Sequence, residues 1–231
     1  MTDQHPLDQA AWSSLTGPHA RFAERVGRVV RYPVDVSPFA ALPPQPGPQD
    51  WSDAAELVGP GGVVVLTLPA TAPAGWTQEF AIPGVQLVDE GVAAAPDDEA
   101  VLLGADDVPE MIALVARTEP GPFLARTHEL GTYLGIRRGG ELVAMAGERL
   151  HPTGFTEISA VCTDAGHRGQ GLGTRLVLAV AHGVRARGET PFLHASASNT
   201  GPIALYEHLG FRLRRTTTFA GFRPPGSAQE G

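Results

Sequence analysis

Three glycines lie close together in the stretch HRGQGLGT (167–174), at positions 169, 171 and 173, and the apolar run LVLAVAHGV begins at residue 176. Glycine lets a backbone approach a ligand closely, and the N-terminus of a helix favours negative charge. The pattern therefore predicts a loop that binds the phosphate groups of an anionic ligand.

Two common phosphate-binding loops do not fit this stretch. A P-loop has a lysine after its last glycine, but all 17 basic residues of the chain are arginine. A dinucleotide-binding loop has the spacing Gly-x-Gly-x-x-Gly, with an acidic residue about 20 positions further on. Here the glycines stand at every second position. The missing lysine excludes a nucleoside triphosphate clamp, and the spacing disfavours a dinucleotide.

A third pattern fits. Arg168, Gly171 and Gly173 match the pattern Arg/Gln-x-x-Gly-x-Gly/Ala of the GCN5-related N-acetyltransferases (GNAT), a family that this chain resembles. Upstream, TEISAVCTD (156–164) is similar to the family's fourth strand. Downstream, the segment 199–211 is similar to the stretch from the family's fifth strand through its last helix.

This resemblance covers residues 102–222, and residues 122–163 resemble the FR47-like branch of the superfamily. It implies the GNAT fold, which belongs to the mixed α/β (α+β) class. We therefore expect a mostly antiparallel, twisted sheet that is splayed where the cofactor enters.

The resemblance also implies acetyl-coenzyme A (acetyl-CoA) as cosubstrate. The fourth strand would pair with its pantetheine arm, opened by a β-bulge, and the glycine loop would hold its pyrophosphate. The eight histidines show no metal-ligand spacing, so we expect no metal. The residues expected to contact the cofactor are Ala160, Val161, Cys162, His167, Arg168, Gly169, Gln170, Gly171, Leu172, Gly173, Thr174, Asn199 and Tyr206.

Acetyl transfer to an amine needs a deprotonated amine, a polarised carbonyl and a proton for the departing thiolate. Tyr206 is the predicted general acid, because a phenol with a pKa of about 10 keeps its proton at neutral pH. A half-buried helix aromatic is the alternative interpretation. Glu157, acting through a water, is the first candidate for the base, although a solvated acid at a strand end explains it equally well. Glu148 is the second candidate, and Glu129 and His128 are weaker ones.

Cys162, the single cysteine, would carry an acyl group only with a lowered pKa and a neighbouring base. We interpret it as a buried strand residue, and the resemblance implies direct attack of a primary amine in a ternary complex. Two other functions stay open: a catalytically silent acyl-CoA sensor or regulatory module, and an acyltransferase with longer acyl donors. The sequence does not identify the amine, and the family's frequent dimers leave a homodimer open.

A regular series of elements must position these residues. The apolar periodicity and the turn residues predict, in order, a helix (105–118), a short helix (122–131), three strands between residues 131 and 164, a helix to about residue 187, a strand (191–197), a helix (201–210) and a terminal strand from Phe211. Gly139 and Gly140 predict a hairpin turn between the first two strands. Further upstream, GGVVVLTLP (61–69) predicts a buried strand, and EFAIPGVQLVDEG (79–91) predicts two short strands around a turn.

Charge divides the chain unevenly. Residues 1–164 hold 9 arginines against 22 acidic residues, whereas residues 165–231 hold 8 against 3. An anionic small ligand at the loop fits this distribution, and a nucleic acid does not. The opening residues lack the pattern of a signal peptide, and no apolar segment approaches the roughly 20 residues of a membrane span. We therefore expect a cytoplasmic protein without membrane contact.

The acidic stretch PDDEA (96–100) is interpreted as a boundary between two parts of the chain. Residues 101–231 would form the GNAT acetyltransferase domain. Residues 1–100 would form an N-terminal region, a degenerate half of the same fold that shapes the acceptor pocket.

Overall fold

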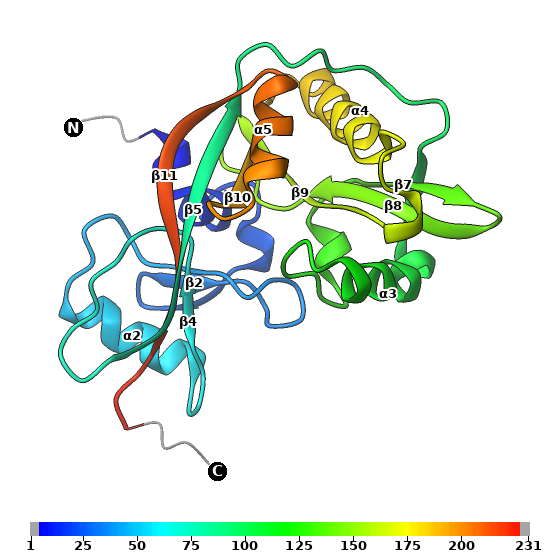
Figure 1. Cartoon of the computed structure of the whole chain (residues 1–231). Coiled ribbons are helices and arrows are strands. Elements are labelled where there is room, and N and C mark those ends of the chain that lie inside the picture. Colours follow the sequence, from blue (N-terminus) through cyan, green and yellow to red (C-terminus); the bar gives the residue numbers. More distant parts are fainter. Residues whose placement is uncertain (1–4, 227–231) are drawn as a thin grey trace.

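Strands from both parts of the chain build one eight-stranded sheet, and the computed structural model describes residues 5–226 of the protein (Figure 1). The order of the strands in this sheet is β4-β11-β5-β10-β9-β8-β7-β6, and β1, β2 and β3 form a separate small sheet. The strands are β1 (Glu24–Val26), β2 (Val29–Arg31), β3 (Ala40–Ala41), β4 (Val64–Leu66), β5 (Thr77–Asp89), β6 (Val101–Leu103), β7 (Tyr133–Arg138), β8 (Glu141–Glu148), β9 (Phe155–Thr163), β10 (Thr190–Ser196) and β11 (Phe211–Arg223).

Within the large sheet, β9 and β10 run parallel, and the other neighbouring strands run antiparallel. The parallel pair is possible because a helix connects the two strands. This arrangement confirms the mixed α/β class and the mostly antiparallel sheet. The hairpin between β7 and β8 turns at Gly139 and Gly140, which both have positive φ (59° and 92°), as the sequence predicted.

Five α-helices and five short 3₁₀ turns occur among the described residues. They are α1 (Ala10–Leu15), α2 (Pro48–Val58), α3 (Val108–Thr118), α4 (Leu172–Ala186) and α5 (Thr200–His208), with 3₁₀ turns η1 (Pro6–Gln9), η2 (Ala20–Phe22), η3 (Ala105–Asp107), η4 (Thr127–Leu130) and η5 (Ala165–His167). None of the helices within residues 5–226 combines the length and the apolar character that a membrane crossing requires.

Two of these helices cover opposite faces of the sheet at β8 and β9 (Figure 1). On one face, Leu176 and Val180 of α4 pack in a core with Ile158 of β9. On the other face, Met111 of α3 packs in a second core with Cys162 of β9. Plain alternation would place Ile158 and Cys162, four positions apart, on one face, but a bulge at Ala160 adds one residue between them, so Ile158 faces α4 and Cys162 faces α3.

The prediction of two short strands at residues 79–91 was wrong, because β5 is one strand of 13 residues. It pairs with β11 along its whole length, and its second half also pairs with β10, from Gly84 to Val88. Pro83, which lacks a backbone donor, stands just before this second pairing begins, where a proline is tolerated in a strand. The Pro-Gly pair therefore marks the place where pairing of β5 with β10 begins, and it does not form a turn.

The prediction of a helix at residues 122–131 was also wrong, because the segment holds the short 3₁₀ turn η4. The hydroxyl of Thr127 accepts a hydrogen bond from the Leu124 N–H (2.8 Å) and donates one to the Val36 carbonyl (2.7 Å). The first bond competes with a regular helix, and the second ties the segment to the N-terminal region.

β4 and β5 belong to the residues before position 100, yet they lie in the same sheet as β6 to β11. β5 is inserted between β10 and β11, in the middle of the sheet. The division of the chain near residue 100 stays a prediction, and in the structure the two parts share one sheet.

Candidate active site

The sheet opens between β9 and β10. These strands pair in parallel only from Thr190 opposite Phe155 to Phe192 opposite Glu157, and beyond that point the pairing stops. On its other edge β9 is irregular, since its register against β8 shifts between Met145 and Gly147. Ala160 lies in this bulge with φ +52°. The bulge and the splay are the features that the family resemblance implies for this strand.

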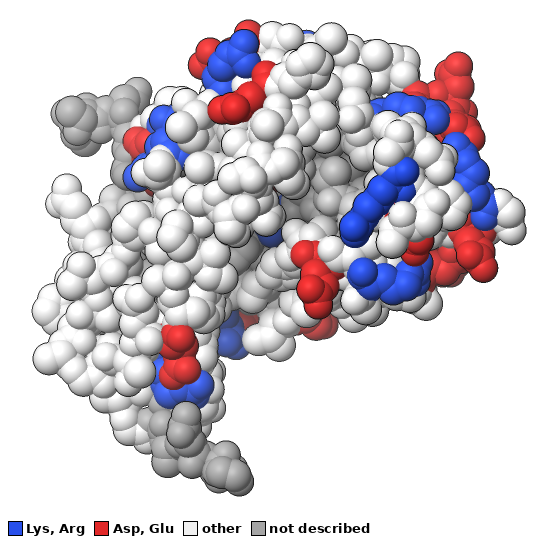
Figure 2. Space-filling model, viewed as in Figure 1, with Lys and Arg blue, Asp and Glu red and all other residues white. Residues whose placement is uncertain are grey.

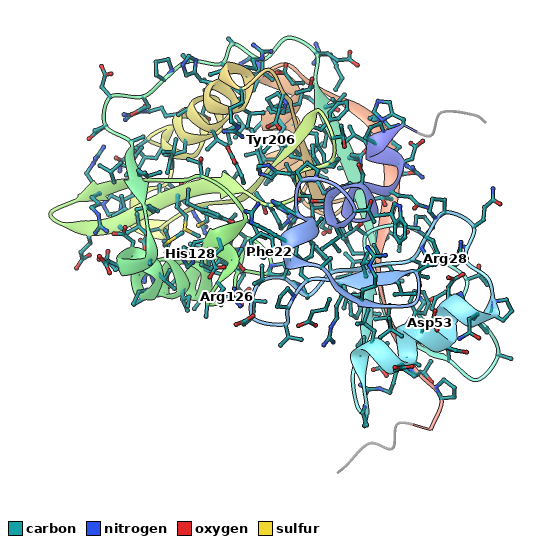
Figure 3. All side chains as sticks on the ribbon, turned by 180° about the vertical axis from the view of Figure 1, so that it is seen from behind. Phe22, Arg28, Asp53, Arg126, His128 and Tyr206 are labelled. Atoms are coloured by element: carbon teal, nitrogen blue, oxygen red, sulfur yellow. The ribbon has the colours of Figure 1, made fainter. Side chains whose placement is uncertain are left out.

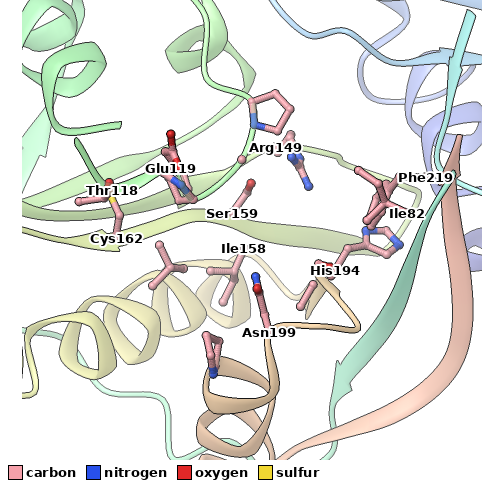
Figure 4. A pocket seen from close by; sticks show the side chains of 18 of the residues that line it. Ile82, Thr118, Glu119, Arg149, Ile158, Ser159, Cys162, His194, Asn199 and Phe219 are labelled. Carbon is pink, nitrogen blue, oxygen red and sulfur yellow. The ribbon is translucent and has the colours of Figure 1, made fainter. Parts of the chain in front are cut away.

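A cavity of about 840 Å³ lies at the splay, and Figure 4 shows it from close by. In the space-filling view the molecule is hollowed on the face seen in Figure 1, with mostly uncharged surface in the hollow and arginine at its edge (Figure 2). The volume is in the range of small-molecule and cofactor sites. Six of the residues expected to contact the cofactor line the cavity: Ala160, Val161, Cys162, Arg168, Asn199 and Tyr206.

The remaining predicted cofactor residues flank Arg168 in the sequence and run into the first turn of α4, beside the cavity. They are His167, Gly169, Gln170, Gly171, Leu172, Gly173 and Thr174. Gly169 and Gly171 have φ of +76° and +74°, a conformation that favours glycine. The first four N–H groups of a helix have no acceptor inside the helix. The loop and the first turn therefore offer backbone donors to an anion. Arg168 directly precedes Gly169 and lines the cavity.

Tyr206 projects from α5 into the cavity and packs edge-on against Phe211 (ring centroids 6.2 Å apart). Burial raises the pKa of its phenol to about 12. The hydroxyl therefore keeps its proton well above neutral pH. Seen from behind, Tyr206 lies far from Arg28 and Asp53 of the N-terminal region (Figure 3).

Glu157 is fully buried and does not line the cavity. Both carboxylate oxygens are bound by Arg149: Nε donates to Oε2 (2.9 Å) and Nη2 donates to Oε1 (2.7 Å). Nδ1 of His194 lies 2.8 Å from Oε1. Burial raises the pKa of Glu157, but the charge and hydrogen bonds of Arg149 outweigh burial and hold the pKa well below its usual range. These contacts leave Glu157 a poor proton acceptor.

Glu148 is buried as well, and it too lies outside the cavity lining. Its carboxylate accepts hydrogen bonds from Arg187 Nη2 (2.8 Å) and the Thr132 N–H (3.2 Å), and His151 Nε2 is 3.3 Å away. Burial alone would raise the pKa of Glu148. The hydrogen bonds from these partners outweigh burial, so the pKa lies below its usual value. The structure therefore does not bring Glu148 and Tyr206 to one site.

The weaker candidates lie elsewhere. Glu129 pairs with Arg126 (2.7 Å), and neither Glu129 nor His128 lines the cavity. Cys162 does line it, but burial raises the pKa of its thiol, and Thr118 is its side-chain partner. A buried thiol with a raised pKa is a weak nucleophile at neutral pH.

Sequence reasoning did not single out several cavity residues. Glu119, at the end of α3, lines the cavity, and so do Arg149 and His194 beside Glu157. The N-terminal region adds Phe39 and Val65. Glu119 followed by Pro120 marks a helix end in the sequence, but nothing in the sequence shows that this end faces a cavity.

Comparison with known proteins gives a consistent result. The chain matches the family model of FR47-like proteins over residues 133–220. It is similar to a crystal structure described as a GNAT-family acetyltransferase from Novosphingobium aromaticivorans, with 39% identity and a TM-score of 0.87. The similarity covers 96% of this chain and 99% of that one.

A GCN5-related N-acetyltransferase from Kribbella flavida shares the fold, with a TM-score of 0.63 and 19% identity over 94% of this chain and 96% of the other. Among curated proteins, a mycothiol acetyltransferase of Corynebacterium glutamicum (strain R) is 38% identical over 76 residues. That stretch is 32% of this chain and 26% of the relative, so the match spans about a quarter of the relative's length.

Proposed function

The chain belongs to the GNAT family of acetyltransferases, and from this premise we propose that it transfers the acetyl group of acetyl-CoA to a primary amine. The observation that carries the proposal is the splay between β9 and β10. One cavity lies at this splay, and it is bordered by the glycine loop, the bulge at Ala160 and the side chain of Tyr206.

The donor would lie along this splay. Backbone N–H groups at the start of α4 would bind its pyrophosphate, helped by the helix dipole and by the charge of Arg168. The unpaired edge of β9 from Ile158 onward would pair with the amides of the pantetheine arm. A pairing of this kind is the addition of an extended ligand to a free strand edge.

Tyr206 would supply the proton for the departing thiolate. The amine nitrogen attacks the thioester carbonyl, the N–C bond forms, the C–S bond breaks, and the phenol of Tyr206 protonates the sulfur. With a pKa of about 12, Tyr206 holds this proton at neutral pH. Binding donor and amine together supplies the orientation.

Direct attack fits better than an acyl-cysteine route. Burial raises the pKa of Cys162, and the buried His194 is occupied by Glu157 on one ring nitrogen and by Gln86 (3.0 Å) on the other. The thiol therefore keeps its proton and His194 is not free to remove it, so Cys162→Ala should keep turnover within about twofold.

Isothermal titration with acetyl-CoA tests the proposal, with Gly171→Ala as a variant whose loop is strained. We expect micromolar binding to the wild type and weaker binding to the variant. Thiol release in the presence of a panel of primary amines then tests transfer. The absence of heat at millimolar acetyl-CoA would remove the donor from the scheme, whereas binding without thiol release would favour a catalytically silent acyl-CoA sensor.

A further inference from the structure

Glu119 is the sole carboxylic acid among the described residues that line the cavity. It ends α3, where its N–H donates to the Val115 carbonyl (2.8 Å). The ion pairs formed within residues 5–226 occupy both Glu157 and Glu148 but do not include Glu119. Its carboxylate is therefore available to a ligand, while the two acids on the neighbouring strands are not.

The backbone of Glu119 is held in an unfavourable conformation. Its φ of 48° and ψ of 50° are left-handed, a region that is unfavourable for a residue with a Cβ and in which glycine is preferred at helix ends. Pro120 follows and prevents the helix from continuing. A residue keeps such a conformation only where the surrounding structure holds it, and such residues are frequent at functional sites.

Glu119 reaches the cavity from the face opposite the proposed donor site. α3 packs on the face of β9 that carries Cys162, whereas α4 packs on the face that carries Ile158 (Figure 1). In the close-up, Glu119 and Asn199 lie on opposite sides of β9 (Figure 4). An amine that approaches a thioester held on the α4 side would therefore meet Glu119.

The wall of the cavity away from Glu119 is apolar. We call the side chains of Phe39, Phe80, Ile82 and Phe219 the apolar wall. Phe80 and Ile82 stand on the half of β5 that extends past β10, and they are 38% and 45% exposed. Large apolar side chains that remain exposed inside a cavity are suited to an apolar part of a ligand.

Two glycines fix the aromatic rings of this wall. A Cβ on Gly221 would lie 2.3 Å from the Phe80 ring, and a Cβ on Gly84 would lie 2.7 Å from the Phe219 ring. Each ring therefore lies over a glycine of the neighbouring strand. Phe39 stacks on Phe219 with ring centroids 6.5 Å apart, so the wall is a connected surface from three strand regions.

The other ionisable groups among the described cavity residues supply no negative charge for a second ammonium group on the acceptor. Arg149 and Arg168 are cationic, and His194, Cys162 and Tyr206 carry no negative charge at neutral pH. Arg117, near the end of α3, is paired with Asp164 (3.0 Å). Within the described lining of the cavity, one ammonium group has a counter-ion in Glu119 and a second has none.

We propose that Glu119 binds and deprotonates the acceptor, and that the acceptor is a primary monoamine with an apolar substituent that packs on the apolar wall. This inference rests on the proposed acetyl transfer and names its substrate class and its base. It disfavours polyamines and aminoglycosides.

The protons balance as follows. The ammonium group gives one proton to Glu119, and the neutral amine then attacks the thioester. When the N–C bond has formed, the nitrogen loses its second proton to solvent, and Tyr206 protonates the departing sulfur and is reprotonated from solvent. Glu119 then releases to solvent the proton that it accepted. The products are the amide and the thiol, with one proton released overall for each ammonium ion consumed.

Three substitutions of Glu119 test its role, with Glu141→Gln, an exposed acid outside the cavity, as the matched control. Glu119→Gln should lower kcat/KM about 100-fold and remove the ascending limb that the base contributes to the pH profile. Glu119→Asp should restore part of the activity. Glu119→Gly should raise the Tm by a few degrees while it lowers turnover as Glu119→Gln does. An unchanged pH profile for Glu119→Gln would overturn the assignment.

An acceptor series tests the substrate class: hexylamine and phenethylamine against ethanolamine and spermidine, each with acetyl-CoA and thiol release as readout. The two apolar amines should have kcat/KM values at least tenfold higher. Ile82→Ala should raise the KM for hexylamine about tenfold and leave that for ethanolamine unchanged, whereas Leu213→Ala, 52% exposed on β11 but outside the cavity, should change neither.

The outcomes separate the two proposals. Loss of acetyl-CoA binding, or the absence of thiol release with every amine, would contradict the acetyl transfer itself. Turnover of spermidine that equals or exceeds that of hexylamine, with donor binding intact, would contradict only the monoamine assignment.

Discussion

Arg149 and Glu157 form a two-point ion pair at the closed end of the splay, and their side chains are 10% and 0% exposed. His194 and the Leu150 N–H also contact the carboxylate, at 2.8 and 3.3 Å. The pair lies where β9 and β10 stop pairing. It therefore lies at the point from which the strands diverge, and Arg149 lines the cavity there.

Breaking this pair should destabilise the protein. Glu157→Gln leaves the buried guanidinium without its counter-ion, and we expect the free energy of unfolding at pH 7 to fall by about 3–5 kcal/mol. Urea denaturation measures this loss. The double variant Arg149→Met/Glu157→Leu, which removes both charges, should recover much of the stability. A single variant as stable as the wild type would show that the pair contributes no specific stabilisation.

The same pair predicts a pH dependence. Because the pKa of Glu157 is lower in the folded state than in the unfolded state, its stabilisation is present above the unfolded value of about 4.3 and is lost as the pH falls toward the folded value. The stability difference between the wild type and Glu157→Gln should therefore shrink below about pH 4. A difference that stays constant from pH 7 to pH 3 would contradict the lowered pKa.

Substitution by alanine should have different effects at two glycines of the loop, Gly171 and Gly173. A Cβ on Gly171 meets no atom within 4 Å, but its φ of +74° strains any other residue, so Gly171→Ala should lower both the Tm and the affinity for acetyl-CoA. Gly173 has no positive φ, and its Cβ would make only ordinary contacts, at 3.5 Å from Thr163 Oγ1. Gly173→Ala should therefore keep the Tm within about 1 °C and lower only the affinity, through a clash with the ligand. Equal Tm losses would contradict this distinction.

Local patterns predicted the second part of the fold well. The Gly139–Gly140 turn and the order of elements from α3 to β11, apart from the helix expected at residues 122–131, depend on short-range rules, and the structure confirms them. β5 was misjudged because Pro83 and Gly84 indicate a turn locally, whereas pairing with β11 over the whole strand decides the outcome. That pairing joins residues more than 120 positions apart, and no local pattern reports it.

The sequence predicted the backbone of the candidate site, but it did not predict which side chains contact one another there. The glycine loop at the start of α4 follows from glycine and helix signals, and its binding of phosphate stays a prediction. The environment of Glu157 depends on Arg149 and His194, which fold against it from other strands, and these partners lower its pKa. Glu119 could not be identified from the sequence, because its position at the cavity follows from the packing of α3 on β8 and β9.

The bulge at Ala160 gives a test of the splay. With φ +52°, Ala160 is in a conformation that glycine adopts without strain and that a β-branched residue avoids. Ala160→Gly should therefore keep or raise the Tm and keep acetyl-CoA binding, whereas Ala160→Val should lower the Tm by several degrees and weaken binding. Thermal unfolding and titration of the two variants measure this. A Tm for Ala160→Val that equals the wild-type value would show that the bulge is not under strain.

Tyr206→Phe removes the proposed proton donor and keeps the ring that packs against Phe211. The Tm should therefore change little, and the affinity for acetyl-CoA should stay within about threefold, while kcat falls about 100-fold. Because the pKa of Tyr206 is about 12, the wild-type kcat should not decline through ionisation of this group below about pH 11. The sharpest measurement compares acetyl donors: a thioester whose leaving thiol has a low pKa needs less protonation, so it should be affected less by Tyr206→Phe than acetyl-CoA is. An equal loss with both donors would assign Tyr206 to binding and not to proton transfer.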